Sequence, residues 1–174
     1  IKGKTVGIIG LGKIGTRTAE LFHAFGANIL AQSRSLHENA ANYIEQVSQE
    51  ELLRRSDIVV LHCPLNDSTR GMINAEKLAM MKPSALLVNV ARGPVVVEKD
   101  LVNALENGVI AGAALDVFEN EPPLDPASPV LHAPNCLVTP HVAFATQQSM
   151  SLRAEIVFEN LAQWMDGHPI NVIL

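Results

Sequence analysis

A glycine-rich turn near the start of the chain has the residue types and spacing to bind phosphate groups. Gly10, Gly12 and Gly15 have the spacing GxGxxG and follow a short apolar run. Gly10 would let the chain turn sharply, Gly12 would let the backbone approach a pyrophosphate, and Gly15 would let the next helix pack on the strand. The first amides of that helix favour an anion. The motif predicts a dinucleotide site, the alternative being a glycine turn without a ligand.

The type of dinucleotide depends on the residues after the second predicted strand, 27–31. In NAD enzymes an Asp or Glu about 20 residues beyond the glycines binds the ribose hydroxyls. This chain has Ser33, Arg34 and Ser35 there, so a guanidinium and two hydroxyls are available for a 2′-phosphate and no carboxylate repels it. We expect NADP to be preferred, with NAD as the second candidate. The alternative is that Arg34 is only a solvated surface charge.

Two later strands end in residues that could contact ligands. Arg92 follows the predicted strand 85–90 in a glycine-proline turn, and its planar guanidinium suits a carboxylate; the alternative is a structural arginine that bridges loops. His62, Cys63 and Pro64 follow the predicted strand 58–61, at the end where open α/β sheets bind ligands. We expect His62 and Cys63 to be structural, since no partner that would activate the thiol is indicated. Thr69 could donate a hydrogen bond to phosphate.

Strand and helix patterns alternate along the chain, and they would bring these residues together. Further strands are expected at 6–9, 110–115 and 137–139. Helices are expected at 49–55 with Ser48 as the cap, after Asn74 as a cap, at 98–107 and at 146–166; the polar stretch 36–46 is left unassigned. The helix after the glycine turn is expected to bury Ile14, Thr18, Leu21, Phe22 and Phe25. The alternation predicts an α/β fold of the Rossmann type, a doubly wound parallel sheet in a three-layer αβα arrangement.

Composition narrows the classes of function. The chain has 174 residues, of which 48% are hydrophobic, and a formal net charge of −5, so nucleic acid and anionic membrane surfaces are not expected partners. Two cysteines suggest a reducing cytoplasm rather than a disulfide framework. No stretch is long and apolar enough for a membrane helix. Since the chain begins at Ile1 without a Met, we expect it to be a piece of a longer protein.

Four strand-end motifs stand in one order along the chain: GLGKIG, NVARG, DVFENEP and TPH. In these four motifs the chain resembles the D-isomer-specific 2-hydroxyacid dehydrogenase family. It looks most similar to the hydroxypyruvate reductase and glycerate dehydrogenase branch of that family. The resemblance extends over residues 1–172. It implies that residues 1–174 are the NAD(P)-binding domain of such an enzyme, whose separate substrate-binding domain has no counterpart here.

The resemblance implies a catalytic trio of Arg92, Glu121 and His141. Arg92 would bind the substrate carboxylate and polarise the 2-keto oxygen. His141 would protonate that oxygen during reduction and act as the base in the reverse direction. Glu121 would pair with His141, because a carboxylate beside an imidazole favours its charged form. The nicotinamide itself would supply the hydride, so the protein would mainly orient the reactants and supply charge.

The resemblance also implies further cofactor contacts, beyond the three glycines, Ser33 and Arg34. They lie on the pyrophosphate loop, along the cofactor and around the nicotinamide: Lys13, Ile14, Pro64, Thr69, Ala91, Asp116 and Ala143. Branches of the family with a similar Ser-Arg-Ser sequence tend toward NADPH and toward reduction of glyoxylate, hydroxypyruvate or aryl pyruvates.

The expected function is therefore NAD(P)H-dependent reduction of a small 2-keto acid to the D-2-hydroxy acid. The resemblance implies a homodimer, a small 2-keto or 2-hydroxy acid as the ligand, and no metal. The isolated chain is expected to turn over poorly without the substrate domain. Two alternatives stay open: a dinucleotide-sensing binding protein like the corepressors of this fold, and a cofactor-binding fragment that catalyses nothing.

Overall fold

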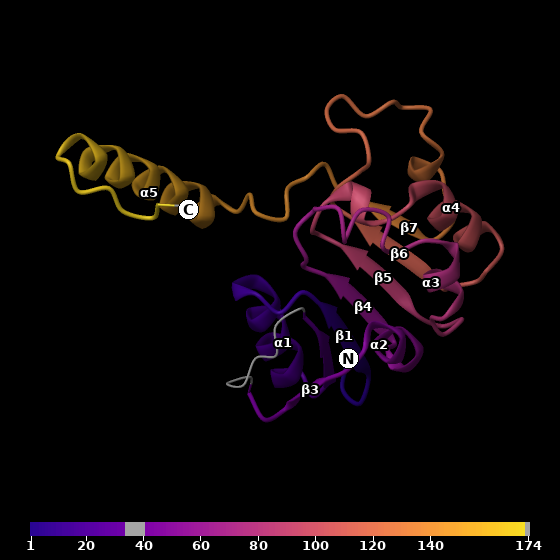
Figure 1. The fold of residues 1–174 in the computed structure, drawn as a ribbon. Helices are drawn as coiled ribbons and strands as arrows, with labels where there is room; N and C mark the ends of the chain where they lie inside the picture. Colours follow the sequence, from indigo (N-terminus) through magenta and orange to yellow (C-terminus); the bar gives the residue numbers. More distant parts are fainter. Residues whose placement is uncertain (34–40, 173–174) are drawn as a thin grey trace. The chain divides into compact units, whose positions relative to one another are not determined.

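Seven parallel strands form one sheet in the described residues, 1–33 and 41–172, of the computed structural model (Figure 1). The strand order is β3-β2-β1-β4-β5-β6-β7, so the order reverses beside β1 and leaves a crevice between β1 and β4, as in doubly wound sheets. The strands are β1 Thr5–Ile9, β2 Asn28–Gln32, β3 Ile44–Gln46, β4 Ile58–Leu61, β5 Leu86–Asn89, β6 Gly112–Leu115 and β7 Cys136–Val138. The predicted fold class is confirmed.

The chain divides into two units, Ile1–Pro140, which holds the sheet, and His141–Leu174. The helices of the first unit are α1 Lys13–Ala24, α2 Gln49–Arg55, α3 Ala75–Ala79 and α4 Glu98–Glu106, with the short 3-10 turns η1 Gly93–Val95 and η2 Pro129–Leu131. Side chains of α2, α3 and α4 share one buried cluster with one face of the sheet. Ala19 of α1 packs with Val6, Ile8 and Ile29 on the other face. The layers are therefore those predicted.

The buried face of α1 differs from the prediction. Gly15 and Ala19 point inward, whereas Ile14 and Phe25 are 70% and 67% exposed and Leu21 also faces outward. The helix lies so close to the glycine turn that a Cβ on Gly15 would stand 2.0 Å from the carbonyl oxygen of Gly10. Only the smallest residues fit at that contact, so Ile14, Leu21 and Phe25 face outward. The prediction holds in part, because Thr18 and Phe22 are half-buried and Phe22 packs against the core on this side of the sheet.

Most other elements match their predicted positions to within a few residues. The predicted caps of two helices are confirmed: Ser48 accepts a hydrogen bond from Glu51 N of α2, and Asn74 accepts one from Lys77 N of α3. The strand β3 was missed, because it has only three residues and only Ile44 of them is buried. It extends the sheet by pairing with β2.

The second unit contains the helix α5, Gln147–Met165, which begins with a capping box between Thr146 and Ser149. Its side chains are not buried within the unit, and Phe158, Trp164 and Met165 are more than half exposed. A helix with large exposed apolar residues is typical of a surface that contacts another protein part. None of the helices in the described ranges is both long and apolar enough to cross a membrane.

Asp57 joins three strands at the amino-terminal edge of the sheet. Its carboxylate accepts hydrogen bonds from Thr5 N at 2.8 Å and from Lys82 Nζ at 2.9 Å. Its backbone donates to Thr5 O and accepts from Leu86 N. The hydrogen bond from Thr5 N, followed by that from Lys82, lowers the pKa of Asp57. The ionised carboxylate therefore stabilises the fold.

We expect Asp57→Asn to lower the free energy of unfolding at pH 7 by about 1–2 kcal/mol, since hydrogen bonds to a charged group are weakened. A carboxyl group whose pKa is lowered by folding contributes stability at pH values above its ordinary pKa of about 4. This contribution is lost as the pH falls below that value. Urea unfolding followed by circular dichroism should therefore give a smaller difference at pH 3 than at pH 7. Asp67→Asn, at an exposed loop residue, is the matched control. An equal difference at both pH values would contradict this role.

Candidate cofactor and substrate site

The glycine turn is built by close contact between backbone segments. Gly10 has a φ of 100°, which favours glycine, and a Cβ there would lie 2.7 Å from Cys63 N at the end of β4. Gly15 fits against Gly10 as described above. These two glycines have the structural tasks that the sequence predicted for them.

Gly12 differs from both, because a Cβ on it would meet no atom within 4 Å. It is the N-cap residue of α1, which receives no side-chain cap, and the first turn of α1 contains no acidic residue. The first amides of the helix therefore face open space and can bind an anion. This arrangement fits a pyrophosphate, and Lys13 and Ile14 lie exposed on the same turn.

A cavity of about 500 Å³ lies at the crevice between β1 and β4. It brings together five of the predicted cofactor residues, and its lining consists of Ile9, Gly10, Leu11, Gly12, Gln32, Ser33, Gln49, His62, Cys63, Pro64, Ser68, Thr69 and Met72. Ser33 lies one residue beyond the end of β2, where the adenosine ribose of the dinucleotide is expected. Arg34, the other half of that prediction, lies outside the described residues.

The wall formed by the segment after β4 is held by side-chain contacts. The Thr69 hydroxyl donates to Pro64 O at 2.7 Å and accepts from Asn66 N at 2.9 Å, so it mainly shapes its own loop. His62 Nε2 lies 3.0 Å from Thr18 Oγ1 of α1. Burial lowers the pKa of His62, so the ring is neutral at pH 7. Sequence reasoning treated His62 as structural, and the structure adds that it lines the cavity.

Cys63 is buried at the same wall, and burial raises the pKa of its thiol. A thiol that stays protonated is a weak nucleophile. This agrees with the prediction of a packing residue.

The Arg92 turn is organised by a residue that sequence reasoning missed. Asn89, the last residue of β5, is 1% exposed. Its Nδ2 donates to Arg92 O at 3.1 Å, and its Oδ1 accepts from Ala91 N at 3.0 Å. The turn holds Arg92 with an exposed side chain, whose Nη1 donates to Ala91 O at 2.7 Å. The sequence feature that could have revealed this role is an asparagine at the end of an otherwise apolar strand.

The loop that carries Glu121 lies directly against the Arg92 turn. A Cβ on Gly93 would stand 1.7 Å from Phe118 O and 2.6 Å from Glu119 N, so the two backbones touch. Phe118 N donates to a carboxylate oxygen of Glu121. The structure thus joins the segments that carry two members of the predicted trio, Arg92 and Glu121.

Asp116 is 4% exposed and follows β6. Thr139 Oγ1 donates to its Oδ1, and Asp116 N donates to Asn89 O at 3.0 Å. Asp116 therefore lies beside the strand end that forms the Arg92 turn. Its predicted place near the nicotinamide stays a prediction.

His141 and Ala143 belong to the second unit, whose first residue is His141. His141 has a φ of 55°, a conformation that non-glycine residues rarely adopt, and its ring makes an edge contact with Phe144 at 6.1 Å between centroids. The pairing of His141 with Glu121 and the approach of Ala143 to the nicotinamide remain predictions.

Comparison with known proteins places this chain in a family. The profile of the D-isomer specific 2-hydroxyacid dehydrogenase NAD binding domain matches residues 1–143. A hydroxypyruvate reductase of Blautia hydrogenotrophica is 40% identical over 177 residues, which cover 99% of this chain and 54% of that protein. A glyoxylate reductase of Aeropyrum pernix is 44% identical over 176 residues, 99% of this chain and 52% of its own.

A solved structure agrees with these relatives. The NAD-complexed D-isomer specific 2-hydroxyacid dehydrogenase of Lactobacillus delbrueckii ssp. bulgaricus has a TM-score of 0.88 at 33% identity, over 98% of this chain and 55% of that one. The chain belongs to the D-isomer specific 2-hydroxyacid dehydrogenase family and contains its NAD-binding domain. It spans about half the length of these relatives.

The glycine turn gives a paired prediction. Gly12→Ala should weaken binding of the dinucleotide at least tenfold, about 1.4 kcal/mol, because the new methyl group occupies the open space above the helix amides. The free energy of unfolding should stay within about 0.5 kcal/mol of wild type. Gly15→Ala should instead lower it by about 1–3 kcal/mol through overpacking. Calorimetric titration and urea unfolding measure the two effects, and a Gly12→Ala protein with wild-type affinity would contradict the assignment.

Proposed function

We propose that the protein containing this chain reduces a small 2-keto acid, such as hydroxypyruvate or glyoxylate, to the D-2-hydroxy acid with NAD(P)H. In this proposal residues 1–174 serve as its NAD(P)-binding domain. The observation that carries the proposal is the Asn89-anchored turn at the carboxyl edge of the sheet, which carries Arg92 and packs at Gly93 against the loop of Glu121. The activities named for the two relatives support the same substrate class.

The residues of the chain have distinct tasks in this reaction. The Arg92 guanidinium binds the substrate carboxylate and lies near the keto oxygen as negative charge develops there. His141 gives a proton to that oxygen, and Glu121 stabilises the charged imidazole that does so. A nicotinamide cofactor held at the glycine turn supplies the hydride.

We also propose a preference for NADPH over NADH. Ser33 lines the cavity one residue beyond β2, where NAD enzymes have a carboxylate. A hydroxyl at this position leaves room for a 2′-phosphate and can donate a hydrogen bond to it. Arg34 and Ser35 add a positive charge and a second hydroxyl in the sequence.

The assembly that we propose is a cytoplasmic homodimer. Leu86 of β5 and Leu137 of β7 are 43% and 67% exposed. Their strand neighbours Leu87 and Val138 pack into the cluster beneath α2, α3 and α4, so both leucines lie on the opposite face. An apolar sheet face of this kind supports a subunit contact. Cys63 and Cys136 are both free thiols, in keeping with a reducing compartment.

The catalytic proposal is tested by His141→Ala in the complete gene product. Loss of the proton donor should lower kcat for hydroxypyruvate or glyoxylate reduction by about 100- to 10,000-fold, with the affinity for the dinucleotide unchanged. His168→Ala changes an exposed histidine of the same unit and serves as the matched control. Stopped-flow or steady-state absorbance at the reduced-nicotinamide band measures the rates. Wild-type kcat in His141→Ala would remove His141 from the mechanism.

The cofactor preference is tested by Ser33→Asp. A carboxylate at this position should repel the 2′-phosphate and accept hydrogen bonds from the ribose hydroxyls, so the ratio of NADPH to NADH affinity should fall at least tenfold. Calorimetric titration of both cofactors against wild type and variant gives the ratio, with Ser68→Asp, at another serine of the cavity lining, as the control. Tighter binding of NADH by the wild-type protein would overturn the NADPH proposal.

A further inference from the structure

The helix α4 starts without a cap from its own sequence. Val97 occupies the N-cap position and provides no side-chain hydrogen bond. In α2 and α3 the corresponding positions hold Ser48 and Asn74, which do cap their helices. The amides at the start of α4 therefore need an acceptor from elsewhere in the chain.

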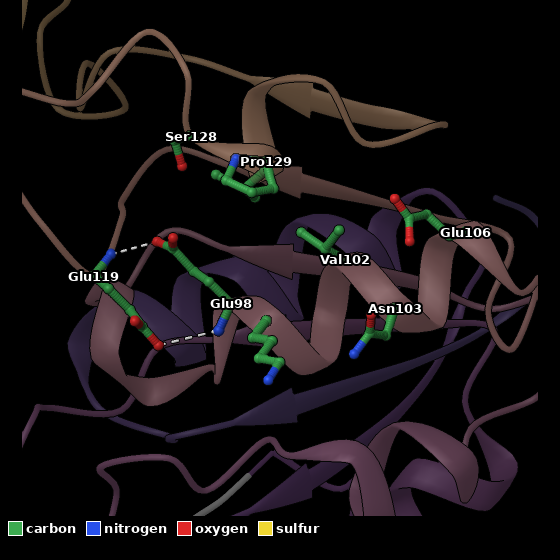
Figure 2. Close-up of a pocket in the computed structure, with 9 residues that line it drawn as sticks. Glu98, Val102, Asn103, Glu106, Glu119, Ser128 and Pro129 are labelled. Atoms are coloured by element: carbon green, nitrogen blue, oxygen red, sulfur yellow. Dashed lines mark hydrogen bonds between the residues drawn. The ribbon is translucent and has the colours of Figure 1, made fainter.

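Glu119 supplies that acceptor from 21 residues further along. Its Oε1 accepts a hydrogen bond from Glu98 N, the first amide of α4, at 3.1 Å. In return, Glu119 N donates to Oε1 of Glu98. Figure 2 shows the two side chains crossing between helix and loop with both hydrogen bonds drawn, beside a cavity of about 400 Å³. We call this reciprocal pair, Glu98 and Glu119, the glutamate clasp.

The clasp joins the two segments that carry predicted catalytic residues. On one side, α4 follows the Arg92 turn after five intervening residues, 93–97. On the other side, Glu119 lies two residues before Glu121. Between them, Gly93 touches the backbone of Phe118 and Glu119, and Phe118 N donates to the Glu121 carboxylate. A change in the clasp should therefore displace Glu121 relative to Arg92.

We propose that Glu98 is a positioning residue, which fixes the loop of Glu121 against the Arg92 turn through the glutamate clasp. The inference rests on the proposed function, because only that function gives Glu121 a part in the reaction. Glu98 itself is 23 residues from Glu121 in sequence and acts on the reaction only through the loop.

The contribution of Glu98 is its acceptor oxygen rather than its charge. Burial, together with the nearby carboxylates of Glu119 and Glu121, raises the pKa of Glu98. The negative charge is thus disfavoured in this environment, while the oxygen satisfies a backbone amide that would otherwise lack this partner. An amide side chain of the same length can accept the same hydrogen bond, which makes Glu98→Gln the conservative variant.

The test compares Glu98→Ala and Glu98→Gln in the complete gene product, with Glu106→Ala as the matched control. Glu106 lines the same cavity but lies at the opposite end of α4 (Figure 2). Hydrogen exchange of the peptide 116–125, followed by mass spectrometry, reports on the loop. Steady-state kinetics with glyoxylate or hydroxypyruvate report on the reaction. Glu119→Ala removes the other half of the clasp and replaces Glu98→Ala if that variant does not fold.

We expect Glu98→Ala to speed exchange of the peptide 116–125 at least tenfold and to lower kcat at least tenfold, with the KM for the cofactor unchanged. Glu98→Gln and Glu106→Ala should match wild type in both measurements. Unchanged exchange and kcat in Glu98→Ala would overturn the inference and leave the proposed function intact; so would faster exchange with wild-type kcat, which indicates a merely structural clasp. A wild-type protein that reduces no 2-keto acid would overturn the proposed function, and hydrogen exchange alone would then decide whether Glu98 holds the loop.

Discussion

The candidate site depends on backbone segments that touch each other with no room for side chains between them. At the carboxyl edge of the sheet, Gly10 lies against the segment 62–63, Gly15 against Gly10, and Gly93 against Phe118 and Glu119. Each contact would clash with a Cβ. The loop after β1 is therefore packed against the segment after β4, and the loop after β5 against the loop after β6. The position of a functional side chain in one loop depends on the loop that it touches.

Such close packing leaves polar groups that must find hydrogen-bond partners, and side chains at the strand ends supply them. Asn89 satisfies the amide and carbonyl of the Arg92 turn, and Thr69 does the same for the segment after β4. The glutamate clasp satisfies one amide in the helix and one in the loop. Asn89 and the clasp bind no substrate in the proposed reaction, but they hold the segments that carry Arg92 and Glu121. A buried polar group that lost its partner would cost about 1–3 kcal/mol.

What the sequence could predict follows from the range of the interactions involved. Strands β1, β4 and β5 and the caps Ser48 and Asn74 depend on near neighbours, and they were found. The buried face of α1 was not, because hydrophobic periodicity favours Ile14 and Phe25, whereas the contact with Gly10 admits only small residues. The clasp joins residues 21 positions apart and has no local pattern. The strand β3 is too short to show one.

The helix starts also explain why the anion site is expected at α1 rather than elsewhere in the first unit. Among the helices described there, α2 and α3 are capped by Ser48 and Asn74, and α4 is capped by Glu119. All three also have acidic residues in their first turns, whereas α1 has none and has Gly12 in place of a capping side chain.

A cap that accepts a hydrogen bond from a helix start satisfies one of its amides, and an acidic residue in the first turn offsets its positive dipole. The starts of α2, α3 and α4 are therefore closed to an external anion by the chain itself. At α1 the sequence leaves out both the cap and the acidic residue, so the amides stay available for a ligand. At α4 the first amide donates its hydrogen bond to Glu119 of the loop that carries Glu121. At α1 the corresponding amides can donate theirs to the phosphates of the proposed cofactor.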